Sequence, residues 1–402
     1  MTNPTTQIAL KNNTSSSVVY AYVTGLDINK NNAYGFLQPD GKTLYYPDSP
    51  SQVQQPLAVD CAIPLGAPGT TTTVTIPQLA GGRIWFAVDN KLTFLLNPGP
   101  GIVEPSVTNT DDLNYKLNWG FCEFTCYVDF VAIPIALELL NTAGNKQVVQ
   151  GLPTDGLDQI CAQLTQQGAS ENGIWDKLIV KGPDGKNLRA MSPNSGRIGN
   201  SGLFDGYYQP YVDEAWSKYT NTDLKVDTQA QWGIAHSPSH PPSTSSAAAR
   251  GPSGTYPIQT RDEMGAIGAR LAAAFNRSTL ISNPDQPDAI QNGANNYYKT
   301  NPTNHYARIV HGVNLDGRGY AFPYDDVVPS GATGPDQAGT VFDGSPELLT
   351  VTVGGPNGGS VGNGREDKGA AGDGDKEKKK TAFDFPALFK KIMAMLKGIF
   401  RK

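Results

Sequence analysis

The sequence predicts a mainly β protein that carries a second, mixed α/β lobe. Glycine (44) and proline (30) are abundant, and charged residues make up only 17% of the 402 residues. Runs of β-branched and aromatic residues lie between Gly, Pro, Asn and Asp breaks at residues 71–76, 83–88 and 349–353. Such runs are typical of short strands in a sandwich or barrel. Because a single core stops growing at about 250–300 residues, this length favours two lobes.

Residues 1–145 and 300–354 are expected to form the β lobe. Strands are predicted at residues 15–27, 71–79, 82–90, 92–96, 305–313 and 347–353, each bounded by turn residues. The prolines and glycines of residues 95–106 predict a rigid loop. Strands at both ends of the chain and helices between them indicate that the α/β lobe is inserted into, or appended beside, the β lobe.

Residues 146–299 are expected to form the mixed α/β lobe. A first helix is predicted to end at Gly168, a second spans residues 204–220, and a third begins with the capping box Thr260–Glu263. A Pro/Ser-rich loop at residues 236–254 separates the last two. The apolar faces expected for the first and third helices are Leu157, Ile160, Cys161 and Leu164, and Ile267, Leu271 and Phe275.

The C-terminal part of the chain has a different composition. Residues 355–380 predict a flexible Gly-rich, charged linker. Residues 381–402 predict a basic amphipathic helix, because apolar residues recur at helical spacing and most of the Lys and Arg residues lie off that stripe. An anionic membrane surface or a groove on a partner protein would suit this helix, and folding back on the body is the alternative.

Charge and histidine placement exclude several function classes. A net charge of −5 provides no general basic face, so we expect no nucleic-acid partner. His236 and His240 lie in the Pro-rich loop, where helical pairing is forbidden, and His305 and His311 alternate in an expected strand. The four cysteines show no C-x-x-C spacing. We therefore expect no metal site.

Residues 120–131 place Glu123 and Asp129 in an apolar, aromatic setting. Hydrolysis of a glycosidic bond requires one acid to protonate the leaving oxygen and one carboxylate to activate water or attack the sugar. Aromatic neighbours raise the pKa of a carboxyl group and stack on sugar rings. From spacing alone, a solvent-facing row of acids on a strand is the commoner interpretation.

Six segments, in order along the chain, resemble glycoside hydrolase family 64. They are residues 82–107, 118–125, 127–137, 226–233, 271–280 and 303–327, and the resemblance covers about residues 8–353. It implies a thaumatin-like β-barrel or sandwich lobe that faces the α/β lobe across a wide groove. It also implies an extracellular enzyme, although residues 1–17 have neither the basic start nor the apolar run of a signal peptide.

The resemblance implies inverting endo-hydrolysis of β-1,3-glucan without metal or cofactor. By motif, Glu123 in "FCEFT" corresponds to the general acid and Asp129 in "YVDFV" to the general base, while Thr125 corresponds to a substrate contact. Trp119 and Tyr127 are the aromatic candidates for contact with sugar, and a core position is the alternative for Trp119. We expect a monomer that binds β-1,3-glucan.

The segment between the two acids departs from the family pattern, which has a full hairpin there. One extended strand would set Glu123 and Asp129 ~20 Å apart, whereas inverting enzymes hold the two carboxyls at about 6.5–9.5 Å. A three-residue loop over Thr125–Tyr127 would bring the Cβ atoms to about 4.5–5.5 Å, yet "TCY" contains no turn-forming residue. The alternative function is a glucan-binding or interaction protein without catalysis.

Other polar and aromatic residues have a structural and a functional interpretation. Residues 314–327 carry Asp316, Arg318 and Asp325, which suit a polar turn better than a substrate contact. Glu104 is a possible third acid. Further tryptophans that could stack on sugars are Trp85, Trp216 and Trp232.

Three explanations account for the short segment: a natural member that has lost the hairpin, a tight loop that preserves function, or missing coding sequence. We favour the third, and expect sequencing of the transcript to reveal extra codons between those for Thr125 and Asp129. A transcript that matches the given chain without interruption would refute it.

Overall fold

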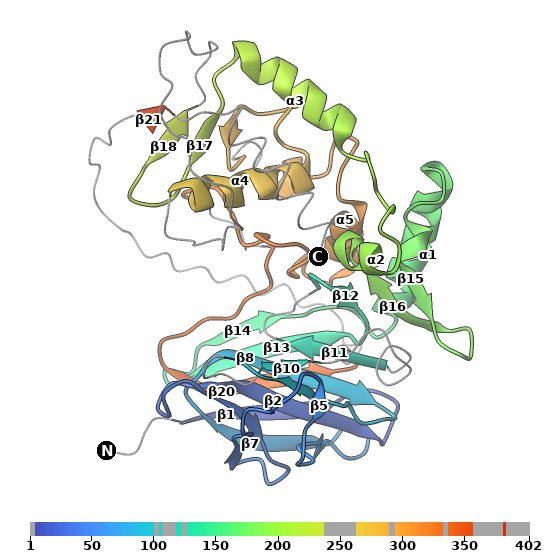
Figure 1. Cartoon of the computed structure of the whole chain (residues 1–402), viewed down its shortest axis with the longest axis vertical. Coiled ribbons are helices and arrows are strands. Elements are labelled where there is room, and N and C mark those ends of the chain that lie inside the picture. Colours follow the sequence, from blue (N-terminus) through green and yellow to red (C-terminus); the bar gives the residue numbers. More distant parts are fainter. Residues whose placement is uncertain are drawn as a thin grey trace. The chain divides into compact units, whose positions relative to one another are not determined.

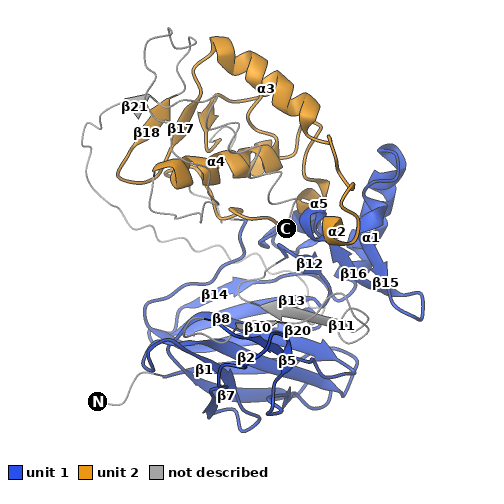
Figure 2. Cartoon of the chain, in the orientation of Figure 1, with its two compact units in different colours: residues 1–195, 309–321, 337–359 blue, residues 196–308, 322–336, 360–402 orange. Residues whose placement is uncertain are grey.

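The computed structural model describes residues 5–99, 104–106, 118–122, 127–236, 263–288, 294–332, 337–356 and 381–382. The chain forms two compact units, coloured blue and orange in Figure 2. Unit 1 comprises residues 1–195, 309–321 and 337–359, and unit 2 comprises residues 196–308, 322–336 and 360–402. The prediction of a mainly β chain with additional helices is confirmed. The lobe boundaries expected at 145/146 and 299/300 stay predictions, and the compact units divide at other positions.

A five-stranded sheet in unit 1 brings together strands from the start, middle and end of the chain (Figure 1). Its order is β14 (Lys146–Val149), β13 (Ile135–Asn141), β20 (Pro346–Val353), β1 (Thr5–Asn12) and β7 (Thr71–Pro77). β1 and β20 run parallel, and the other neighbours are antiparallel. Strands near residues 8 and 353 are therefore paired at the centre of this sheet.

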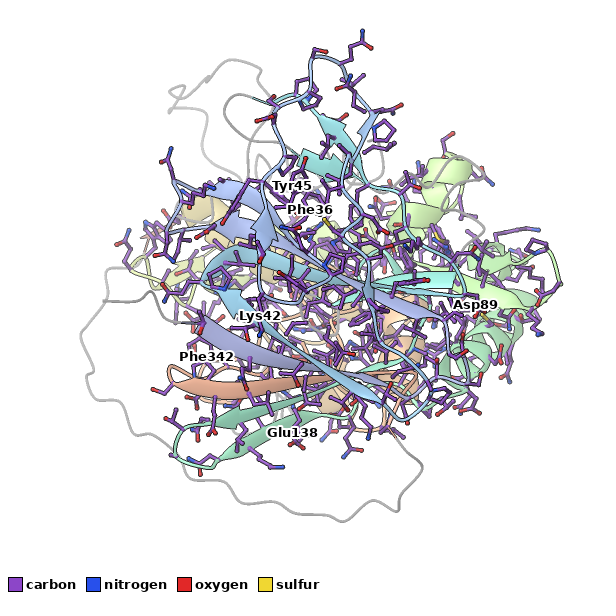
Figure 3. All side chains as sticks on the ribbon, turned by 90° about the horizontal axis from the view of Figure 1, so that it is seen from below. Phe36, Lys42, Tyr45, Asp89, Glu138 and Phe342 are labelled. Atoms are coloured by element: carbon purple, nitrogen blue, oxygen red, sulfur yellow. The ribbon has the colours of Figure 1, made fainter. Side chains whose placement is uncertain are left out.

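A six-stranded sheet supplies much of the remaining core of unit 1. Its order is β11 (Asn118–Cys122), β8 (Leu79–Val88), β2 (Val19–Asp27), β3 (Ala33–Leu37) and β4 (Leu44–Tyr45), with β6 (Ile63–Pro64) paired to β2. Phe36 of β3, labelled in Figure 3, and Phe86 of β8 are fully buried. The predicted strands at 15–27, 71–79 and 82–90 correspond to β2, β7 and β8.

Two three-stranded sheets complete the strands of unit 1. One is β10 (Glu104–Ser106), β9 (Leu95–Asn97) and β5 (Gln55–Pro56); the other is β12 (Phe130–Val131), β16 (Asn187–Met191) and β15 (Ile179–Lys181). The loop expected at residues 95–106 is therefore wrong at both ends, because Glu104 pairs with Asn97 in an antiparallel ladder. The middle of that segment lies outside the described residues.

Two of the expected helices are confirmed with shifted ends, and a third is confirmed in its described part. The first is α1 (Gly156–Ser170), which packs against β16 and buries Ile160, Cys161 and Leu164. It continues past Gly168, which is a packing position rather than a stop: a Cβ there would lie 3.0 Å from the Asp176 backbone nitrogen. The other two are α3 (Gln209–Asn221) and α4 (Glu263–Arg277) in unit 2. Thr260 of the expected capping box lies outside the described residues.

The strand expected at residues 305–313 is wrong, because this segment forms helix α5 (His305–Val313). Asn304 caps the helix: its Oδ1 accepts a hydrogen bond from Ala307 N at 3.0 Å. Buried positions recur at Tyr306, Ile309, Val310 and Val313, which is a helical period. His305 and His311 therefore lie on a helix and are buried there.

The core of unit 2 lies between α3, α4 and a short sheet. The sheet order is β19 (Asp285–Gln286), β17 (Lys225–Asp227), β18 (Ile234–His236) and β21 (Thr381–Ala382). The expected face of α4, with Ile267, Leu271 and Phe275, is buried in this core. Thr381 and Ala382 form a strand rather than the start of the expected tail helix. The rest of that helix, and the linker from residue 357 on, lie outside the described residues, so a membrane or partner contact stays a prediction.

Within the described ranges, no helix has both the length and the apolarity required to cross a membrane.

A buried ion pair ties α4 to the segment after residue 321 in unit 2. Arg277 Nη2 lies 3.0 Å from Asp325 Oδ1, and the two side chains are 3% and 0% exposed. The guanidinium also donates to the carbonyl oxygens of Asp325 and Val327 and lies 4.3 Å from the centre of the Tyr297 ring. Asp325 is therefore a structural residue, as the sequence favours.

Removing Asp325 should destabilise the protein strongly, because Arg277 would keep a buried charge without its counter-ion. We expect Asp325→Ala to lower the free energy of unfolding by about 3–5 kcal/mol. Lys225→Met provides the control, because it removes an exposed pair with Asp285 at 3.4 Å and should cost below about 1 kcal/mol. Urea unfolding measures both, and equal losses for the two variants would contradict this assignment.

Candidate active site

Asp129 lies at the end of a short ladder in unit 1. β12 pairs with β16 in antiparallel register, with Phe130 opposite Met191. One step further along the two strands, Ser192 N donates to the Asp129 carbonyl oxygen at 2.9 Å. The backbone of Asp129 is thus held where the ladder ends and helix α2 (Pro193–Gly199) begins.

The first turn of α2 also contacts the Asp129 side chain. Ser195 N donates to Ser192 Oγ at 3.3 Å, which is the bond of an N-cap serine to the third helical residue. Pro193 occupies the first helical position, where its missing N–H leaves no bond unmade. The Ser195 side chain makes a hydrogen bond to the Asp129 carboxyl group. Ser192 and Ser195 are both buried.

The environment of Asp129 pushes its pKa in two directions. Asp129 is exposed to solvent, yet the surrounding protein atoms desolvate its carboxyl group and raise its pKa above the ordinary value of 3.8. The positive charge of Arg83 and the hydrogen bond from Ser195 partly oppose this rise. A solvent-accessible carboxyl with a raised pKa has the properties of a general base, because it can reach water and bind a proton more readily.

Arg83 connects this carboxyl to the six-stranded sheet. It lies on β8, is exposed, and its guanidinium carbon lies 5.9 Å from the centre of the Trp85 ring. Trp85 itself is buried and donates from Nε1 to Thr24 Oγ1 at 3.1 Å. Its indole is therefore a core group and does not present a free face to sugar.

Tyr127, two residues before Asp129, anchors this segment in the core of unit 1. Its N–H donates to the Tyr320 carbonyl oxygen at 2.8 Å, and its side chain is 3% exposed. The ring packs so closely on Gly319 that a Cβ there would lie 2.7 Å from Tyr127 Cε2. Tyr127 as a sugar contact stays a prediction that its burial does not support.

The other predicted site residues are placed less fully. Glu123 and Thr125 lie outside the described residues. Trp119 belongs to β11, opposite Ala87 of β8, but its side chain is outside the described part. The same holds for the side chain of Glu104 in β10.

Asp316 and Arg318 shape the loop after α5, as the structural interpretation expects. Asp316 accepts bonds from Arg318 N at 3.1 Å and from Gln150 N at 2.8 Å. The Arg318 guanidinium donates to the carbonyl oxygens of Val148 and Thr340. In the part of the chain that the structure describes, no group of three His, Cys, Asp or Glu side chains could hold a metal ion.

Sequence reasoning missed Arg83, Ser192 and Ser195 as neighbours of Asp129. "SPNS" at residues 192–195 is a recognisable helix start, with serine before proline. That signal locates the helix but not the carboxyl group that it contacts. The contact joins residues far apart in the sequence, and only the fold brings them together.

A sequence model of the family described as "Beta-1,3-glucanase" matches residues 4–353. Two curated relatives, the glucan endo-1,3-beta-glucosidases of Cellulosimicrobium cellulans and Arthrobacter sp. (strain YCWD3), are each 27% identical to this chain over 314 and 320 residues. Each match covers 70% of this chain and 54% of the relative. The chain thus spans about half the length of these relatives.

Solved structures share the fold. A laminaripentaose-producing β-1,3-glucanase in complex with laminaritetraose is 27% identical, with a TM-score of 0.70, and the match covers 87% of this chain and 98% of that one. A β-1,3-glucanase domain from Clostridium beijerinckii has a TM-score of 0.63 at 18% identity, covering 88% and 100%. The second likeness, at this identity, concerns the fold alone.

The contact between Tyr127 and Gly319 provides a test of the support beneath Asp129. We expect Gly319→Ala to cost about 1–3 kcal/mol, because the new methyl group would overlap the buried Tyr127 ring. Gly312→Ala is the matched control, since a Cβ there meets nothing within 4 Å. Thermal unfolding of the two variants measures the difference, and equal melting temperatures would contradict the packing described.

Proposed function

The chain belongs to glycoside hydrolase family 64, the β-1,3-glucanases, and we propose that it hydrolyses internal bonds of β-1,3-glucan by an inverting two-carboxylate mechanism. The observation that carries the proposal is the state of Asp129, which is open to solvent, has a raised pKa and is fixed at both its backbone and its side chain. The relatives named as glucan endo-1,3-beta-glucosidases and the relative bound to laminaritetraose support the choice of substrate.

In the proposed reaction, Asp129 acts as the base. Its carboxylate accepts a proton from a water molecule, and the water oxygen attacks the anomeric carbon from the face opposite the leaving group. Glu123 acts as the acid and gives its proton to the departing glycosidic oxygen. One attack from the opposite face inverts the configuration at the anomeric carbon.

The family resemblance supports the role of Glu123, which corresponds to the general acid in the motif "FCEFT" and lies outside the described residues.

Several finer features belong to the same proposal. We propose that the strands of unit 1 correspond to the thaumatin-like lobe that the family resemblance implies. Thr125 and Trp119 would contact the glucan. The resemblance also supports an extracellular, monomeric enzyme that uses no metal or cofactor.

Loss of either proposed carboxyl should abolish hydrolysis. We expect Glu123→Gln and Asp129→Asn each to reduce the release of soluble oligosaccharides from insoluble β-1,3-glucan by about 10²–10⁴-fold, the usual contribution of general acid or base catalysis. Binding to the polysaccharide, measured by co-sedimentation, should remain.

A matched acid elsewhere in unit 1 serves as the control. Glu138, labelled in Figure 3, carries a surface carboxylate on β13. This carboxylate pairs with Lys146 at 2.7 Å, and Glu138→Gln should leave the release of oligosaccharides unchanged. Release that survives Glu123→Gln would exclude Glu123 as the acid. A wild-type protein that binds glucan and releases nothing would instead be a glucan-binding protein.

A further inference from the structure

Asp129 is held by one short segment at two points. The backbone bond from Ser192 N to the Asp129 carbonyl oxygen is 2.9 Å long, and the Ser195 side chain bonds the carboxyl group. Both serines belong to the turn that opens α2, and both are buried. The same turn therefore holds both the backbone carbonyl group and the side-chain carboxyl group of Asp129.

We infer that Ser195 is a positioning residue that sets the orientation of the Asp129 carboxylate for its reaction with water. The inference rests on the proposed role of Asp129 as the base. Ser195 lies outside the motif that contains Asp129 and far from it in the sequence.

The geometry explains how a serine performs this task. A serine hydroxyl has one proton, and a carboxylate offers only acceptor oxygens, so the hydroxyl donates to Asp129. This hydrogen bond restrains the carboxylate, while Asp129 as a whole stays exposed to solvent. A base so fixed in rotation presents a lone pair to one water position, which lowers the cost of reaching the reactive arrangement.

Ser195 is itself held in place, which a positioning group requires. Its N–H donates to Ser192 Oγ at 3.3 Å, and its side chain is enclosed, with the residue 6% exposed. The turn is further constrained because Pro193 has a fixed backbone φ angle. The backbone that carries the Ser195 hydroxyl is therefore held in place.

A merely structural serine and a positioning serine make different predictions. A structural serine would affect only the folded stability when it is removed. A positioning serine that donates to the ionised carboxylate also favours the ionised form and lowers the pKa of Asp129. Its removal should raise that pKa and slow the reaction with water.

The experiment compares wild type, Ser195→Ala, Ser195→Thr and Ser195→Cys in glucan hydrolysis as a function of pH. For Ser195→Ala we expect kcat to fall by about 10–100-fold, as for other orienting partners of reactive groups, with KM little changed. Because the base must be ionised, the acidic limb of the kcat profile should move to higher pH. Ser195→Thr retains a hydroxyl and should restore both quantities in large part, and Ser195→Cys, a weaker donor of similar size, should behave like Ser195→Ala.

Ser170→Ala is the matched control, because it removes a serine hydroxyl that bonds within α1 of the same unit. Thermal unfolding confirms that each variant is folded, and Ser195→Cys replaces Ser195→Ala if the smaller side chain prevents folding. An unchanged kcat and an unmoved acidic limb in both variants, with Asp129→Asn inactive, would overturn the inference and leave the proposed function intact.

A failure of the proposed function is distinguished by a readout that needs no activity. The carboxyl carbon of Asp129 can be titrated by ¹³C nuclear magnetic resonance, with Asp129→Asn to assign the signal. We expect a higher midpoint in Ser195→Ala than in wild type. If the wild-type protein releases no oligosaccharide, the proposed function fails. Equal titration midpoints of Asp129 in the wild-type protein and in Ser195→Ala would overturn the inference about Ser195, whether or not the protein is active.

Discussion

The parallel pairing of β1 with β20 is the constraint on which the rest of unit 1 depends. β20 lies between β1 and β13, so one strand bonds both the start of the chain and the segment that follows Asp129. Ile135, which lies only six positions after Asp129 in the sequence, pairs with Val353. A slip of one residue in this register would turn every buried side chain of β13 to the opposite face.

Two glycines close the sheet at the same point. Gly354 N donates to the Pro134 carbonyl oxygen at 2.8 Å, and its φ of +102° is one that L side chains rarely adopt. A Cβ at Gly354 would lie 2.6 Å from the backbone of Asn13, and one at Gly151 would lie 1.9 Å from the Ile135 oxygen. At Gly354 and Gly151, a side chain would overlap the neighbouring backbone. These close contacts fix the backbone that follows Asp129 against the five-stranded sheet.

The sequence was most informative where local chemistry and tertiary packing agree. α4 buries the apolar face that its periodicity predicts, and α1 buries its predicted face except for Leu157, which is half-buried. The sequence of α5 resembles a strand because it contains β-branched residues and evenly spaced histidines. The Asn304 cap and the recurrence of Tyr306, Ile309 and Val313 indicate a helix. For the site, the motif identified Asp129 but not Ser195 or Arg83, because their contacts with it arise from the pairing of β12 with β16 and from the six-stranded sheet. Glu123 lies outside the described residues, so its proposed role rests on the motif alone.

The opposing influences on the pKa of Asp129 suit its proposed role as a base, which must both gain and lose a proton. Desolvation makes the carboxylate a stronger base, but if it acted alone, the group would hold its proton at higher pH and become idle. Arg83 and Ser195 act against desolvation and keep the ionised form available. The pKa of Asp129 is higher in the folded than in the unfolded protein. The free energy of unfolding therefore decreases as the pH rises from the unfolded pKa through the folded pKa and Asp129 ionises. Asp129 therefore costs the protein stability in its ionised form, and its proposed role as the base would account for a carboxyl group at this position.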